Sequence, residues 1–187
     1  HFEYGTSDVK DRCISEARFF RAFFHMMLAM GWNNPPLVDH VLNGDEKPGN
    51  TPHDEILAFC EKEFSEIIPY LRERKNQADK SGAHIVTKAA AQAMLGRVQI
   101  YEEKWNEAKA SLKKVIDSGK YDLVPGADWR SLFHPEGDGS PEKIFEFNFE
   151  ADPSNPMSVY SHALGTQHIK AFNWRNDHTY IPTSLYQ

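Results

Sequence analysis

The segment from Ala171 to Tyr180, AFNWRNDHTY, combines aromatic rings with polar side chains over a short stretch. An aromatic ring can stack on the apolar C–H face of a sugar, while amide, carboxylate and guanidinium groups bond to the sugar hydroxyls. The expected platforms and polar partners are Trp174, Tyr180, Asn173, Arg175, Asn176 and Asp177. The alternative for Trp174 is ordinary packing against helices, and the sequence leaves that alternative open.

Catalytic carboxylates are the next chemistry to consider, and Glu146 and Glu150 form the best pair. They would share one face of an extended segment, separated by four residues and therefore by about 13 Å. Glycosidase carboxylate pairs lie only roughly 5 to 9.5 Å apart. We interpret the two glutamates as a solvated strand face and predict no catalytic residue.

Histidines are numerous, at nine, but their spacing does not match that of a zinc site. His162 and His168 lie six residues apart with no acid between them. The sequence also contains no glycine-rich phosphate loop, nucleophile elbow or Cys–His signature. We therefore predict no metal and no cofactor.

Composition narrows the class of protein further. A formal net charge of −6, with lysines and arginines scattered along 187 residues, argues against a general nucleic-acid binder. No apolar run approaches the roughly 20 residues of a membrane span. The chain opens without an initiator Met or a signal peptide, so we expect an internal piece of a longer polypeptide. Cys13 and Cys60 are expected to be buried thiols, although a disulfide stays open.

Helical periodicity dominates the first part of the chain. Residues from about Ser7 to Met30 predict one helix, with Gly31 just past its end. From Phe19 onward this helix is apolar almost all round, which predicts burial between neighbours. Trp32 and Trp105, at helix ends, are expected to pack, and Trp129 is expected in the core.

A second helix is expected after a connection rich in Pro, Gly and Asn. Thr51 would cap it, Pro52 would occupy its first position, and Pro69 would end or kink it. The expected buried stripe is Ile56, Cys60, Phe64, Ile67 and Leu71.

Two further helices, at about 87–102 and 106–118, resemble a degenerate tetratricopeptide (TPR) pair. The repeat pattern is W-x2-L-G-x2-Y followed by A-x3-F. The chain keeps Leu95-Gly96 and Ala108, whereas the aromatic positions hold Gln92, Gln99 and Leu112. Small residues at these positions predict close packing of two helices, and such a pair must belong to something larger.

The remaining segments complete the expected architecture. Charged residues 72–84 predict a solvated loop, and the alternation at 143–150 predicts a half-buried strand. After residue 150 no period is visible. We predict an all-α fold of TPR-like helix pairs with a minor strand, as a scaffold over 1–150. Residues 151–187 would be an irregular, loop-rich, ligand-side segment.

Four blocks of sequence resemble, in the same order, the SusD/RagB family of nutrient-binding outer-membrane lipoproteins. SEARFFRAFFHMMLAMGWNNPPLV resembles its EARFLRA helix, and TPHDEILAFCEKEFSEIIPYL resembles the next helix. TKAAAQAMLGRVQIYEEKWNEAKASLKKVIDSGKYDL resembles its repeat pair, and SPEKIFEFNF its S-x-E-x-I-F-E strand. The chain departs from the family at His25, where Tyr is usual, and at Asn33-Asn34, where Gly-Asp is commoner.

The resemblance implies a surface-exposed lipoprotein without catalytic activity that captures glycans, or in some cases peptides. Such proteins sit over a SusC-type TonB-dependent transporter that imports the ligand. The helical repeats would contact the transporter, and less regular segments would carry the ligand site. The lipidated Cys would lie outside this chain. Two other readings stay open: a TPR-like scaffold that binds a peptide or protein, and a carbohydrate hydrolase.

Overall fold

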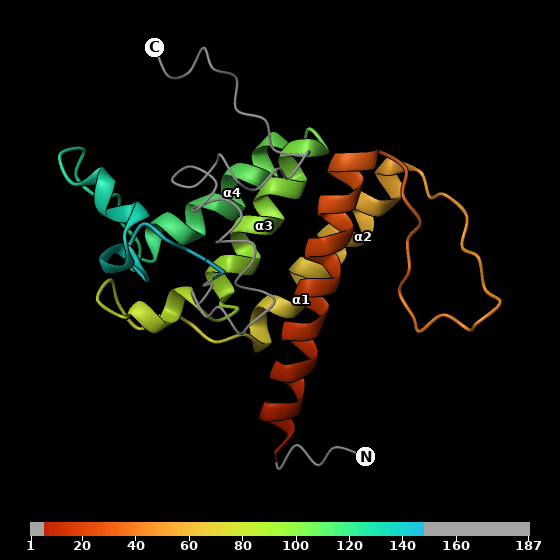
Figure 1. Ribbon diagram of the computed structural model, residues 1–187, viewed down its shortest axis with the longest axis horizontal. Coiled ribbons are helices and arrows are strands. Elements are labelled where there is room, and N and C mark those ends of the chain that lie inside the picture. The colour runs from red at the N-terminus through yellow and green to blue at the C-terminus, as the bar shows by residue number, and fades with distance from the viewer. Residues whose placement is uncertain (1–5, 148–187) are drawn as a thin grey trace, which may run out of the picture. The chain divides into compact units, whose positions relative to one another are not determined.

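The computed structural model describes residues 6–147, and its main elements are four α-helices (Figure 1). They are α1 (Ser7–Trp32), α2 (His53–Ile67), α3 (Lys88–Tyr101) and α4 (Trp105–Asp117). Short 3-10 turns are η1 (Ile68–Tyr70), η2 (Lys80–Ala83), η3 (Trp129–Phe133) and η4 (Pro135–Gly137). The all-α prediction is confirmed.

The chain divides into two compact units, His1–Glu146 and Phe147–Gln187. Nearly all of the second unit falls outside the described residues, so the account below concerns the first. The predicted boundary between 150 and 151 also lies outside them and stays a prediction.

The core forms where α2 packs between α1 and α3. All five residues of the stripe predicted for α2 are buried there, as the helical spacing indicated. From α1 the core receives Phe19, Ala22, Met26 and Ala29. Phe19 also meets Phe64 of α2 edge to face, with ring centroids 5.6 Å apart. Burial of these large side chains supplies most of the driving force that joins the helices.

The prediction that α1 is buried all round is wrong. Phe24 and Met27 are exposed, because the described neighbours of α1 lie along its other face. Its predicted end is also wrong by two residues. Gly31 lies inside the helix, and Asn33 ends it with a φ of 63°. Asparagine tolerates a positive φ better than most residues.

Thr51 does not cap α2 as predicted. Pro52 is the N-cap residue and α2 begins at His53. The Thr51 hydroxyl instead accepts a hydrogen bond from the Leu37 N–H at 3.2 Å, which ties the two ends of the α1–α2 connection together. Pro69 falls in η1, directly after α2, as expected for a residue that ends a helix.

The α3–α4 pair packs closely, as its small residues predicted. Leu95 is buried, and a Cβ added at Gly96 would lie 2.7 Å from the side chain of Leu112. Gln99, at a position that is aromatic in the repeat pattern, is buried and links three helices. Its amide donates to Glu61 of α2 at 3.0 Å and accepts from the Ser111 hydroxyl of α4 at 2.8 Å. A satisfied polar contact thus replaces an aromatic one.

We expect Gly96→Leu to lower the free energy of unfolding by about 1 to 3 kcal/mol through overpacking. The matched control is Gly31→Leu, also inside a helix, where an added Cβ meets nothing within 4 Å. That control should be neutral or slightly stabilising, because leucine has the better helix propensity. Urea unfolding of both variants decides the matter, and a stabilised Gly96→Leu protein would contradict the close packing.

The strand predicted at 143–150 does not form in its described part, residues 143–147. Glu146 donates its N–H to the carbonyl of Ala83 in η2 at 2.9 Å, so this segment bonds to a turn and not to another strand. Phe145 still packs on Phe19, with ring centroids 5.5 Å apart. Phe145, on the apolar side of the predicted alternation, therefore packs against α1 as expected. No strand pairing forms in the described part of this segment.

Three tryptophans are more exposed than the sequence suggested. Trp32, Trp105 and Trp129 were expected to pack or to lie in the core, yet all three are exposed. Each stands at an end of its element, α1, α4 or η3, where few described neighbours can cover an indole ring.

Candidate functional site

The sugar-binding residues predicted from sequence lie outside the described residues. These are Trp174, Tyr180, Asn173, Arg175 and Asp177, together with Asn176. His162, His168 and Glu150 are outside as well. Their roles therefore stay predictions.

Glu146 belongs to the scaffold, and its interpretation as a solvated residue is wrong. One carboxylate oxygen accepts from the N–H of Gly139 at 2.6 Å, and the other pairs with the ammonium of Lys143 at 2.7 Å. His84 lies within 3.3 Å of the same carboxylate. These contacts fasten the 137–146 segment to itself and to η2.

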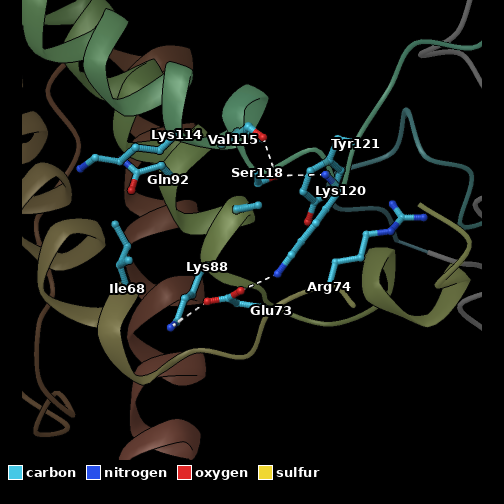
Figure 2. A pocket seen from close by; sticks show the side chains of 11 residues that line it. Ile68, Glu73, Arg74, Lys88, Gln92, Lys114, Val115, Ser118, Lys120 and Tyr121 are labelled. Atoms are coloured by element: carbon cyan, nitrogen blue, oxygen red, sulfur yellow. Dashed lines mark hydrogen bonds and ion pairs between the residues drawn. The ribbon is translucent and has the colours of Figure 1, made fainter. Parts of the chain in front are cut away.

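The described part of the chain contains a pocket between α3, the end of α4 and the segments that follow η1 and α4 (Figure 2). Its volume is about 230 Å³. Ile68, Ala89 and Val115 supply apolar wall, and Gln92 and Tyr121 supply polar atoms. We refer to it as the α3–α4 pocket.

Positive charge gathers around the α3–α4 pocket. Lys88, Lys114 and Lys120 line it, with Glu73 as the one acid among its lining residues. Figure 2 shows Glu73 between two of these lysines, with ion pairs of 3.1 Å to Lys88 and 2.5 Å to Lys120. Hydrogen bonds from Lys120 and Lys88 hold the pKa of the Glu73 carboxyl below its usual value. The acid therefore stays ionised and offsets only part of the lysine charge.

Two polar atoms of the pocket residues are buried without a hydrogen-bond partner. They are Nε2 of Gln92 and the hydroxyl oxygen of Tyr121. Gln92 is only 5% exposed. A buried polar group left unpaired costs about 1 to 3 kcal/mol, so each one in a folded protein calls for an explanation.

Arg74 positions one wall of the pocket, and nothing in the sequence predicted its burial. It lies in the segment predicted to be a solvated loop, yet it is 1% exposed. Its guanidinium donates to five main-chain carbonyls, at 2.7 to 3.1 Å, those of Asn76, Gln77, Gly139, Ser140 and Lys143. It also stacks over the ring of Tyr121, 5.3 Å from the centroid. A stretch of charged residues such as 72–84 does not indicate which of its side chains will be buried.

Among residues 6–147, neither the cysteines nor the possible metal ligands form a disulfide or a metal site. Cys13 and Cys60 are both free thiols. Cys60 is buried as expected, whereas Cys13 is only partly buried. Burial raises the pKa of Cys60 to about 12. No group of three or more His, Cys, Asp and Glu side chains in this range is arranged to hold a metal ion. None of the helices described is both long and apolar enough to cross a membrane.

Comparison with known proteins gives the fold a clear set of relatives. No family model and no curated protein sequence matches the chain. Solved structures do match. A SusD-like carbohydrate-binding protein from Bacteroides fragilis NCTC 9343 is 30% identical over 78% of this chain, with a TM-score of 0.70.

Two other solved structures share the fold at lower identity. Surface glycan-binding protein A from Bacteroides uniformis is 23% identical over 77% of this chain, with a TM-score of 0.68. A laminarin-binding SusD-like protein is 22% identical over 70% of this chain, with a TM-score of 0.61.

These alignments cover only part of each relative, at 28%, 32% and 30% of their lengths. In this chain, helices α1 to α4 carry three of the four sequence blocks. The chain is thus similar in fold, and at 30% identity in sequence, to part of a SusD-like protein, the family that the four sequence blocks resemble.

Proposed function

We propose that the protein is the glycan-binding component of a SusC/SusD-type uptake system for oligosaccharides or polysaccharides. The observation that carries the proposal is the likeness to the SusD-like carbohydrate-binding protein of B. fragilis, at 30% identity over 78% of this chain. The resemblance of the sequence blocks to the SusD/RagB family supports the same conclusion.

In this proposal the protein acts at the cell surface, as a lipoprotein anchored in the outer membrane through a lipidated Cys outside this chain. Its partner is a SusC-type TonB-dependent transporter. Residues 1–150 are the scaffold, and α1 to α4 supply its rigid part. The exposed apolar residues of α1, including Phe24 and Met27, would then be available to other parts of the assembly.

The proposed ligand site lies in the 151–187 segment. Trp174 and Tyr180 would stack on sugar rings, while Asn173, Arg175 and Asp177 would bond to hydroxyls. The division of labour has a physical basis, because irregular segments held on a rigid scaffold can present side chains in many directions.

The protein is proposed to bind without catalysis. A hydrolase would need a free carboxylate pair, and Glu146 is committed to Lys143 and to the Gly139 N–H. A general TPR-like scaffold for peptides remains the other non-catalytic reading, but the B. fragilis relative favours a carbohydrate.

Trp174→Ala in the full-length protein tests the site. We expect glycan binding to weaken by about 1 to 3 kcal/mol, by analogy with aromatic stacking on bases. The melting temperature should hardly change, because little core volume is lost. A glycan array identifies the ligand, and isothermal titration calorimetry then measures the affinity.

Trp105→Ala is the matched control, because Trp105 is an exposed indole on the scaffold and lies outside the proposed site. It should bind the glycan normally. If Trp174→Ala instead binds normally and melts well below the parent, Trp174 is a packing residue and the assignment fails.

A further inference from the structure

We propose that the α3–α4 pocket is a second binding site, and that its ligand is a sugar acid the size of one ring, a uronic acid. This site lies on the helical scaffold, apart in sequence from the site proposed at 171–180. The inference rests on the proposed function only in choosing a sugar acid over other small carboxylic acids.

The first argument comes from the unpaired polar atoms. Gln92 and Tyr121 both line the pocket, and Nε2 of Gln92 and the hydroxyl oxygen of Tyr121 are buried without a hydrogen-bond partner. Both can donate a hydrogen bond. A ligand with several acceptor oxygens, such as a carboxylate or ring hydroxyls, would offer partners to these donors.

The second argument is charge. Lys88, Lys114 and Lys120 bring three positive charges and Glu73 brings one negative charge, which leaves two positive charges around the pocket. Arg74 adds little at the pocket, because its guanidinium is bonded to five carbonyls. The whole chain carries −6, so this local excess is not a consequence of composition. It favours an anion over a neutral sugar.

Lys114 is the lysine whose charge is most available to such an anion. Lys88 and Lys120 both pair with Glu73, whereas Lys114 has no ion pair among the described residues. Its neighbour Lys113 is different, since it pairs with Asp117 at 2.6 Å and does not line the pocket. The two lysines therefore form a matched pair for an experiment.

The third argument is size and polarity. A volume of about 230 Å³ is smaller than the roughly 300 to 1,000 Å³ of pockets for drug-sized ligands, so one ring is a suitable occupant. Ile68, Ala89 and Val115 offer apolar wall to the C–H face of that ring. A bare inorganic anion would leave this wall unused.

The test is binding of D-glucuronate and D-galacturonate to the full-length protein, measured by calorimetry and by thermal shift. D-Glucose and inorganic phosphate are the comparison ligands, one lacking the charge and the other lacking the ring. At least one uronate should bind and raise the melting temperature as its concentration rises. Glucose and phosphate should each bind at least about tenfold more weakly.

Three variants identify the groups responsible. Gln92→Met, Tyr121→Phe and Lys114→Met should each weaken uronate binding by about fivefold to tenfold. Lys113→Met should not. Gln92→Met should leave the melting temperature of the free protein unchanged or higher, because it removes an unpaired buried amide. A purely structural Gln92 would give the opposite result.

The proposal is overturned if neither uronate binds, if glucose or phosphate binds as well as the uronates, or if binding survives both Gln92→Met and Lys114→Met. Trp174→Ala separates the two sites. Uronate binding at the α3–α4 pocket should persist in that variant, whether or not glycan binding is lost.

Discussion

Arg74→Met is expected to lower the free energy of unfolding by about 3 to 5 kcal/mol, the largest effect of any single change considered for this protein. The variant would keep part of the side-chain volume but would leave five carbonyls without their shared donor. These carbonyls belong to the 76–77 turn and to the 139–143 segment, so one guanidinium joins two stretches far apart in sequence. Urea unfolding at neutral pH measures the loss.

Close packing leaves little room for the structure to adapt around Arg74. A Cβ added at Gly82 would lie 2.5 Å from its Cγ. The control is Arg72→Met, two residues earlier, where the side chain is 46% exposed and pairs with Glu16 at 3.2 Å. Exposed ion pairs contribute at most about 1 kcal/mol, so this variant should be nearly neutral. Equal effects of the two changes would mean that Arg74 is not a special contact.

Arg74 also shows where sequence reasoning stopped. The segment LRERKNQADKSGAH is rich in charge, and exposure is the usual fate of such residues. Which of its four arginines and lysines turns inward depends on carbonyls more than 60 residues away, at Gly139, Ser140 and Lys143. Local pattern carries no information about such partners.

Elements whose shape follows from local spacing were predicted well. The buried stripe of α2 and the close approach of Gly96 to Leu112 both follow from helical periodicity. The predicted end of α1 is two residues too early, because Gly31 looks like a stop signal in the sequence but Asn33 ends the helix. The strand failed for a different reason, since alternation indicates a buried face but does not supply a partner strand.

The two glutamines at aromatic positions of the repeat pattern are visible in the sequence as departures from it. Their roles become clear only in the folded protein. The Gln99 amide is hydrogen-bonded to both Glu61 and Ser111. Gln92 lines a pocket, and its amide nitrogen has no partner. The two residues stand at corresponding aromatic positions of one pattern. Their different surroundings make Gln99 a structural residue and Gln92 a candidate binding residue.

The arginines of the SEARFFRAFF block have a structural role of the same kind. Arg18 and Arg21 of α1 both bind the carboxylate of Glu63 in α2, at 2.7 Å and 2.6 Å. The Glu63 side chain is only 6% exposed. This contact fixes the register of the two helices beside the core, so these arginines of the block specify a helix–helix contact.

Glu63→Gln is expected to lower the free energy of unfolding by about 3 kcal/mol at pH 7. Removal of one partner leaves Arg18 and Arg21 without their shared counter-charge. The expected loss lies at the lower end of the range for a buried pair, because the two arginine side chains are 25% and 34% exposed and can regain some water. The control is Glu66→Gln, since Glu66 pairs with the same Arg18 but is 47% exposed. Its loss should cost at most about 1 kcal/mol.

The cost of Glu63→Gln should depend on pH in a defined direction. Burial raises the pKa of the Glu63 carboxyl, but hydrogen bonds from Arg18 and Arg21 outweigh it and set the pKa below its ordinary value of 4.5. A pKa that is lower in the folded state gives stability that is complete above the unfolded value and disappears as the pH falls through the folded one. The difference between the parent and Glu63→Gln should thus be full at pH 7 and shrink below about pH 4.5. Urea unfolding at several pH values checks this, and a difference that stays constant down to pH 3 would show that the ion pair is not its source.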